Sequence, residues 1–549
     1  IPSLAQCAAN TINCNFSAFS AAAANSIGDR VSYASEDPWI ARTIIKGLTN
    51  TTTIRLGDNH QLKNIFAIRT TDVFTNTSLT GTPLAIVDTA SATKLKQTTE
   101  EIQLSGSFLD NDLKYTVGGF FYNEKPNGTA GFSALEINAF FGLSHSLTTT
   151  YLHNSSKAVY GQIDYSLDKL IPGLSLTAGL RQTWDTQSAC TVSQAISPFA
   201  PTPMLIVTPE DVDTYVPSED ACTSATGLAG AAIGASAQTF PDAKFKKLTY
   251  TLGANYQVTP DALVYLAHRR GYRAGGYNTP LLDPYLSAEQ TFQPETLTDW
   301  ELGLKARAQL GSVRATLDLA VYSGKDTANQ LPLNTSNLAA GVCIVDALGT
   351  PGHPTSDCAV GGTPGSLVYV IGATNIVNGA TLTIRGVEAS GTLSPFRGLT
   401  FTGALSYNDI TVDSIQVGDR FQNFLNAAGL PAVFSIQGQP KWTSNAGVLV
   451  DVPGEILGGK LSASFDYHYT GALTSVALTV PSFHQMDLRF NLNDIGGTGV
   501  SAAAWVKNLT NETIYAGTSS SSPTAGAYSF IIGAPRTVGM SLSYKFGAR

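Results

Sequence analysis

Tyr265, Arg269 and Arg273 are the residues of this sequence whose types and spacing best fit a binding site. They recur at every fourth position, so an extended strand places all three on one face. One phenol and two guanidinium groups on a shared face can attract and hydrogen-bond an anionic ligand. The structural alternative is that they pair with carboxylates of the protein itself, and we favour that alternative.

Further contact candidates are aromatic residues in the polar segments between expected strands. They are Tyr277, Tyr285, Phe292, Tyr369 and Tyr515. No spacing rule separates them from ordinary loop aromatics.

Catalytic motifs are missing from the sequence. It contains no H-E-x-x-H, no P-loop and no G-x-S-x-G at a strand-to-helix turn, and its 7 histidines are scattered. His145 and His153 occur in one segment, but two loop histidines are far more often solvated than metal-bound. We therefore predict no enzyme activity, no cofactor and no metal site.

The cysteines fall into three pairs that are local in sequence: Cys7 with Cys14, Cys190 with Cys222, and Cys343 with Cys358. Each pair lies in a long polar segment outside the expected strands. We predict three loop disulfides, which implies an oxidising compartment. Zinc is the competing interpretation, but no C-x-x-C or histidine pair accompanies these cysteines.

The elements that must position these residues alternate apolar and polar side chains. Val538, Met540 and Leu542 share one face of the C-terminal segment, whereas Ser541 and Ser543 share the other. A period of two is that of a strand, and one lipid-compatible face with one polar face is typical of an outer-membrane β-barrel. A soluble β-sandwich or propeller has the same alternation. Segments as long as 294–310 and 377–393 argue against it, because they reach or exceed the ~9–11 residues that cross a bilayer.

Charge and hydropathy exclude two classes of protein. The net charge of −8 and the charged fraction of 13% give no basic footprint for nucleic acid. No apolar run reaches the ~18 residues of a membrane helix, which excludes a helical membrane protein. Because composition does not change along the 549 residues, we expect one unit: an extracellular loop segment over 1–42 and a barrel over 43–549.

We predict an all-β, antiparallel transmembrane barrel with about 17 strands. The strand centres lie near residues 53, 67, 101, 117, 162, 178, 250, 265, 302, 317, 384, 404, 447, 465, 487, 503 and 541. Tight turns alternate with long connections, of which 187–242 and 326–370 are the longest. The first and last strands then run in the same direction, so an antiparallel barrel needs an odd number of further strands. A ~22-stranded barrel satisfies this parity.

Four motifs resemble those of TonB-dependent outer-membrane receptors. They are YLAHRRGYRAGGYN at 265–278, PETLTDWELGLK at 294–305, IRGVE at 384–388 and VKNLTN at 506–511. The order and spacing of the first two together are specific. We expect Glu301, Lys305 and Glu388 within these motifs to face the lumen as structural charge networks.

The resemblance implies a multi-pass barrel in the bacterial outer membrane, in contact with lipid and lipopolysaccharide. It implies energised uptake of a scarce nutrient, most commonly a ferric siderophore, driven by the TonB complex through a plug domain. No segment of this sequence resembles that plug. The alternatives are a structural or adhesive barrel and a passive porin, and the sequence does not choose the cargo.

Overall fold

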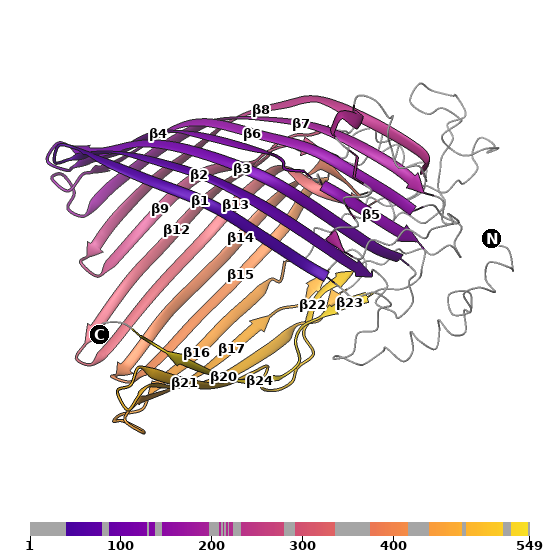
Figure 1. The fold of residues 1–549 in the computed structure, drawn as a ribbon. Coiled ribbons are helices and arrows are strands. Elements are labelled where there is room, and N and C mark those ends of the chain that lie inside the picture. Colours follow the sequence, from indigo (N-terminus) through magenta and orange to yellow (C-terminus); the bar gives the residue numbers. More distant parts are fainter. Residues whose placement is uncertain are drawn as a thin grey trace.

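A single antiparallel sheet dominates the computed structural model (Figure 1). The structure describes residues 40–78, 87–128, 131–137, 145–196, 232–278, 291–334, 374–415, 439–474, 479–519 and 529–546, with short pieces between 208 and 222. No helix among these residues is long and apolar enough to cross a membrane.

The large sheet has 18 strands. They are β1 (Ile40–Leu56), β2 (His60–Ser78), β3 (Val87–Phe108), β4 (Leu113–Pro126), β5 (Gly131–Ile137), β6 (His145–Ser166), β7 (Leu174–Ile196), β8 (Ala232–Thr259), β9 (Ala262–Arg273), β12 (Glu295–Leu310), β13 (Val313–Asn334), β14 (Thr374–Phe396), β15 (Leu399–Ile415), β16 (Trp442–Asp451), β17 (Lys460–Thr470), β20 (Phe483–Ile495), β21 (Val500–Lys507) and β24 (Thr537–Tyr544).

Three two-stranded sheets accompany it. They pair β10 (Gly276–Tyr277) with β11 (Thr291–Phe292), β18 (Leu473–Thr474) with β19 (Thr479–Val480), and β22 (Tyr515–Ser519) with β23 (Ser529–Ile532). A short 3-10 helix, η2, covers Glu219–Cys222.

The strands of the large sheet pair in chain order, each antiparallel to the next, and the sheet curls into a deep trough (Figure 1). β4 and β5 follow one another between β3 and β6. Among the described strands, β1 and β24 each pair on one side only. Every expected strand centre lies in a strand of this sheet, which confirms the predicted barrel architecture.

Tight turns join the strands at one end of the trough. Gly311 takes a φ of 61° in the turn between β12 and β13, a conformation that glycine adopts without steric cost. Asp110 and Asn111 take positive φ between β3 and β4, as side chains that tolerate the left-handed region. The tight turns expected between strands are present.

Two connections expected to be long loops are partly strand. β7 continues to Ile196 and β8 starts at Ala232, inside the expected loop 187–242, and β13 continues to Asn334. These extensions are rich in Ala, Ser, Thr and Gln, so they lack the apolar alternation that marks a membrane strand, although their backbones still pair. The first strand begins at Ile40, slightly before the expected boundary at residue 43.

The two faces of the sheet differ in chemistry. Leu266, Leu302, Val321 and Val387 lie in one row across β9, β12, β13 and β14. They are 38–54% exposed, and exposed apolar residues continue this face across the sheet. The opposite face carries Tyr, Arg, Glu and Asp. An apolar face of this extent is suited to lipid, and the polar face is then the lumen wall.

A loop segment is fastened to the apolar face above the lipid-suited band. Cys190 of β7 is disulfide-bonded to Cys222 of η2, as the sequence predicted. Tyr151 of β6 donates a hydrogen bond to the carbonyl of Pro217, and His153 Nε2 lies 2.7 Å from Glu219 Oε1. The other expected disulfides, Cys7 with Cys14 and Cys343 with Cys358, lie outside the described residues.

Candidate functional site

The candidate site lies on the polar face where β9 pairs with β12. Tyr265 is directly opposite Gly303, and Arg269 is directly opposite Asp299. A Cβ atom at Gly303 would overlap the phenol ring, so the glycine allows Tyr265 to lie flat on the neighbouring strand. The same arrangement recurs on this face in the opposed pairs Tyr160 with Gly118, Tyr322 with Gly386, and Trp505 with Gly539.

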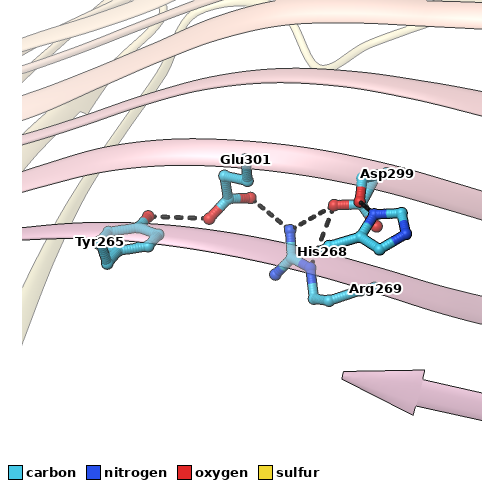
Figure 2. A network of polar contacts seen from close by, with 5 residues as sticks. All are labelled: Tyr265, His268, Arg269, Asp299 and Glu301. Carbon is cyan, nitrogen blue, oxygen red and sulfur yellow. Dashed lines mark hydrogen bonds and ion pairs between the residues drawn. The ribbon is translucent and has the colours of Figure 1, made fainter. Parts of the chain in front are cut away.

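Arg269 connects two carboxylates of β12 (Figure 2). Its Nη2 donates to Asp299 Oδ2 at 2.7 Å and to Glu301 Oε2 at 2.6 Å, and its Nε donates to Asp299 Oδ2 at 3.1 Å. Tyr265 donates to the other oxygen of Glu301 at 2.8 Å. Both carboxylates are 19% exposed and Arg269 is 41% exposed, so the cluster is half-buried in the wall.

His268 belongs to the apolar face. It stacks on Trp300 with ring centroids 4.1 Å apart, and its two ring nitrogens lie 2.9 Å from the carbonyl oxygen of Asp299 and 3.0 Å from the hydroxyl of Tyr250. Both nitrogens therefore have partners, with Nδ1 donating to the carbonyl. His268 is a structural residue of the wall.

A cavity of about 390 Å³ adjoins the cluster on the polar face. Tyr265, Lys305, Asp318 and Glu388 are among its lining residues. Glu301, Lys305 and Glu388 thus face the lumen as predicted, Glu301 in the Arg269 cluster and the other two in this cavity. Together these groups make a wall with more acidic than basic side chains.

A second acidic pair lies beyond the apolar stretch of β13, which ends at Val321. Asp326 is only 5% exposed and contacts Glu295 of β12. Asn329 donates to Asp326 Oδ2 at 2.8 Å, whereas Asp326 Oδ1 has no hydrogen-bond donor. Burial, with a smaller contribution from the charge of Glu295, raises the pKa of Asp326 to about 6. Among the described residues, no group of three or more potential metal ligands occurs.

The predicted site residues separate into different roles. Arg273 is exposed at the end of β9, opposite Glu295, and no described carboxylate lies within ion-pair distance of it. Tyr277 is 9% exposed and donates to the carbonyls of Gln187, at 3.1 Å, and Pro241. Burial raises its pKa above the usual value. Tyr277 is therefore an internal anchor of the wall.

The remaining aromatic candidates do not join the Arg269 cluster. Phe292 is half-buried opposite Gly276 in the β10–β11 pair, and Tyr515 lies in the separate β22–β23 pair. Tyr285 and Tyr369 lie outside the described residues. Of the six ligand-contact candidates that the structure describes, only Tyr265 and Arg269 share a hydrogen-bond partner, which is Glu301.

Sequence reasoning missed Asp299, Glu295 and Asp326. Asp299 could have been predicted from its spacing. It lies two residues before Glu301 and four after Glu295, so a strand places all three side chains on one face. Asp326 carried none, since it falls in a segment that was expected to be a loop.

Comparisons with known proteins agree with this architecture. The sequence matches the family model "TonB dependent receptor-like, beta-barrel" over residues 10–509. No curated protein sequence matches it.

Similar solved structures include two receptors and one transporter. The ferric yersiniabactin uptake receptor FyuA from Yersinia pestis is 14% identical, with a TM-score of 0.64 over 95% of this chain and 65% of its own. The siderophore receptor PiuA from Acinetobacter baumannii is 13% identical, with a TM-score of 0.57 over 94% and 66%. The copper transporter OprC is 10% identical, with a TM-score of 0.55 over 92% and 65%. The chain thus spans about two-thirds of the length of these proteins.

The fold and its two-faced wall define a large antiparallel β-barrel of the outer-membrane type. The family match extends over most of the sequence. This chain belongs to the TonB-dependent receptors, in their β-barrel part, a family of the bacterial outer membrane.

Proposed function

We propose that this chain forms the lumen wall of an outer-membrane receptor that imports a scarce nutrient, with a ferric siderophore as the favoured cargo. The observation that carries the proposal is the polar face of β9, β12, β13 and β14, which has charged and hydroxyl groups, a cavity of about 390 Å³ and an apolar reverse face. Such a wall surrounds a route for a polar solute through lipid.

The charges of the wall suggest how the cargo is contacted. Arg269 is neutralised by Asp299 and Glu301, so it builds the wall. Arg273, exposed at the end of β9 four residues beyond Arg269, is the cation left to meet a negatively charged ferric complex. This assignment favours the structural role for Tyr265 and Arg269 and keeps ligand contact for Arg273.

The choice of a ferric siderophore as cargo is based on the similar solved structures. FyuA is described as a ferric yersiniabactin uptake receptor and PiuA as a siderophore receptor, whereas OprC is described as a copper transporter. Energy would come from the TonB complex, as the family name implies. A structural or adhesive role is the alternative, and the loop fastened through Cys190 and Cys222 is the feature that favours it.

Uptake by living cells tests the proposal. A strain without the gene is complemented with the full-length protein, and accumulation of iron from catecholate, hydroxamate and carboxylate siderophores is followed with and without functional TonB. We expect uptake of one class to require both the gene and TonB. Unchanged iron uptake with lower copper uptake would reassign the cargo, and dependence of neither metal on the gene would leave the adhesive role.

A matched pair of variants tests the proposed contact between Arg273 and the ferric complex. Arg273→Gln is expected to weaken binding of the ferric complex roughly tenfold, because one charge-assisted contact is lost. Arg270→Gln is the control, since Arg270 lies on the opposite face of the same strand, paired with Tyr250. Equal affinities of the two variants would remove Arg273 from the ligand site.

A further inference from the structure

The short β10–β11 pair lies on the polar side of the wall, at the end of the barrel that carries the long connections. Tyr277 shares a buried cluster with Phe245 of β8, and Phe245 is out of phase with Leu248, which is exposed on the outer face. The pair is therefore on the lumen side of β8. We call residues 274–278 and 291–293 the mouth ledge.

Two side-chain amides attach the mouth ledge to β13 and β14. Gln330 Nε2 donates to the carbonyl of Ala274 at 2.8 Å and to that of Gln293 at 3.1 Å. Asn378 accepts from the backbone N–H of Gln293 and donates to its carbonyl at 2.7 Å. The same amide group of Asn378 donates to the carbonyl of Ala328 at 2.8 Å, so it joins the ledge to β13 as well.

A third amide, on Asn278 in the ledge itself, adds two contacts with β14. It donates to the carbonyl of Ile376 at 2.8 Å and accepts from the backbone N–H of the same residue at 2.7 Å. Side-chain amides stay neutral at any physiological pH, so these contacts do not respond to pH by themselves. Any response must come from titratable groups beside them.

Glu295 and Asp326, which we call the carboxyl pair, lie where these amide contacts meet β12 and β13. Asp326 is directly opposite Leu297, so Glu295 is its diagonal neighbour on the polar face, and the two carboxyl groups are in hydrogen-bond contact. Glu295 accepts from the backbone N–H of Gln330 at 2.8 Å, and Asp326 begins a bulge that continues to Asn329. Both carboxyl groups are thus attached to backbone that the amides hold.

The carboxyl pair can stay in contact only while it shares a proton. Asp326 is 5% exposed, and its Oδ1 has no hydrogen-bond donor among the described groups. Two ionised carboxylates in a site with so little water repel each other strongly. That repulsion acts between β12, just after Gln293, and the bulge of β13 at Ala328. These are the two segments that Asn378 joins.

The charged and titratable groups on the surrounding elements do not compensate the carboxyl pair. Arg273 of β9 is opposite Glu295 but outside ion-pair distance, and Tyr272 donates its hydroxyl to β7 at 2.6 Å. Asp299 of β12 is already ion-paired, and Lys325 of β13 projects from the opposite face. Residues 376–382 of β14 include no titratable group.

We propose that the carboxyl pair makes the attachment of the mouth ledge dependent on pH: the ledge is fixed while Glu295 and Asp326 share a proton and loosens when both are ionised. The ledge is then firmer in a mildly acidic medium than in an alkaline one. Arg273 directly precedes the ledge, so the pair also determines how firmly this cation is positioned. That consequence for the cargo rests on the proposed function, whereas the behaviour of the ledge does not.

Hydrogen–deuterium exchange of the full-length protein in detergent, followed by mass spectrometry, tests the proposal. Exchange is measured at about pH 5 and about pH 7.5 and corrected for the chemical rate. We expect the corrected exchange of the ledge in the wild type to rise about tenfold between them, the equivalent of one pKa unit. Asp326→Asn and Glu295→Gln each leave a single carboxylate, so each is expected to keep exchange slow at both pH values.

Two further variants make the comparison specific. Asp318→Asn removes the same charge from the polar face of β13, in the cavity nearer the tight turns, and is expected to keep the tenfold rise of the wild type. Asn378→Ala removes the amide that joins the ledge to β13 and is expected to give fast exchange at both pH values. Slow exchange of β12 and β13 near the tight turn at Gly311 verifies that each variant is folded.

The proposal would be overturned by ledge exchange in the wild type that does not change with pH. A rise in Asp326→Asn or Glu295→Gln as large as that of the wild type would also overturn it, as would a ledge that stays protected in Asn378→Ala. Because no readout involves transport, failure here leaves the uptake proposal intact, and a failed uptake assay leaves the pH dependence of the ledge to be decided by itself.

Discussion

Arg269 on β9 is shared between two carboxylates of β12, with Nη2 2.7 Å from Asp299 Oδ2 and 2.6 Å from Glu301 Oε2. The three groups carry a net charge of −1, so the cluster offers no surplus positive charge to a ligand. It joins two strands on the lumen side, where each lost contact leaves a half-buried carboxylate without its partner.

Replacing Arg269 by Gln is expected to destabilise the barrel by about 1–3 kcal/mol, a range lowered for the 41% exposure of the guanidinium group. Arg269→Lys is expected to recover less than half of the loss, because an ammonium cannot form the same two-pronged contact. The midpoint of heat-induced unfolding measures both. Equal midpoints for Arg269→Gln and the wild type would contradict this role.

Gly303→Ala is expected to displace the ring of Tyr265 and to break its hydrogen bond with Glu301. The loss is expected to exceed that of Tyr265→Phe, which removes the hydroxyl but keeps the flat ring. Gly271→Ala is the control, since a Cβ there meets no atom within 4 Å. Unfolding midpoints of the three variants should fall in the order Gly271→Ala, Tyr265→Phe, Gly303→Ala, and any other order would argue against the packing.

Reducing the Cys190–Cys222 disulfide is expected to release the segment around η2 while the large sheet stays intact. Without the disulfide, the described contacts that hold the segment are hydrogen bonds from Tyr151 and Thr239, the His153–Glu219 pair and the packing of a few small apolar side chains. Limited proteolysis of Cys190→Ser with Cys222→Ser should give faster cleavage between residues 197 and 231. Cleavage rates equal to those of the oxidised protein would show that the disulfide is dispensable for docking.

Asp326→Asn is expected to stabilise the protein at pH 8 and to change little at pH 4. The pKa of Asp326 is about 6 in the folded protein, against an ordinary value of 3.8, so the folded state binds more protons between these two pH values. Its stability is therefore fully present at low pH and decreases as the pH rises towards 6. The difference in unfolding midpoint between variant and wild type should grow from pH 4 to pH 6.5 and then stay constant. Asp261→Asn, at an exposed turn, is the control.

Strand positions could be predicted because a membrane barrel encodes them by local alternation. Leu302 and Leu317 were found from their own neighbours, and the turn at Gly311 from its glycine. The extensions of β7, β8 and β13 could not be found in this way. Beyond the membrane, neither face has to be apolar, so residues such as Thr191 and Gln194 pair in strands with no pattern to reveal them.

The site was predictable in part for the same reason. Tyr265 and Arg269 were placed on one face by their spacing, and Glu301 by its position in a motif. Their meeting depends on the register of β9 against β12, which is a property of two strands together. The burial of Tyr277 depends on contacts with Gln187 and Pro241, distant in sequence, and no local pattern records it.

The aromatic rings laid over glycines determine how wide the passage through the barrel is. Tyr160, Tyr265, Tyr322 and Trp505 occupy area along the lining and take little of the cross-section. A bulkier residue in place of any of the four glycines would turn a ring towards the axis and narrow the bore, without adding a single group to the lumen itself. The width of the bore therefore depends on four glycines, which have no side chain and leave room for the rings.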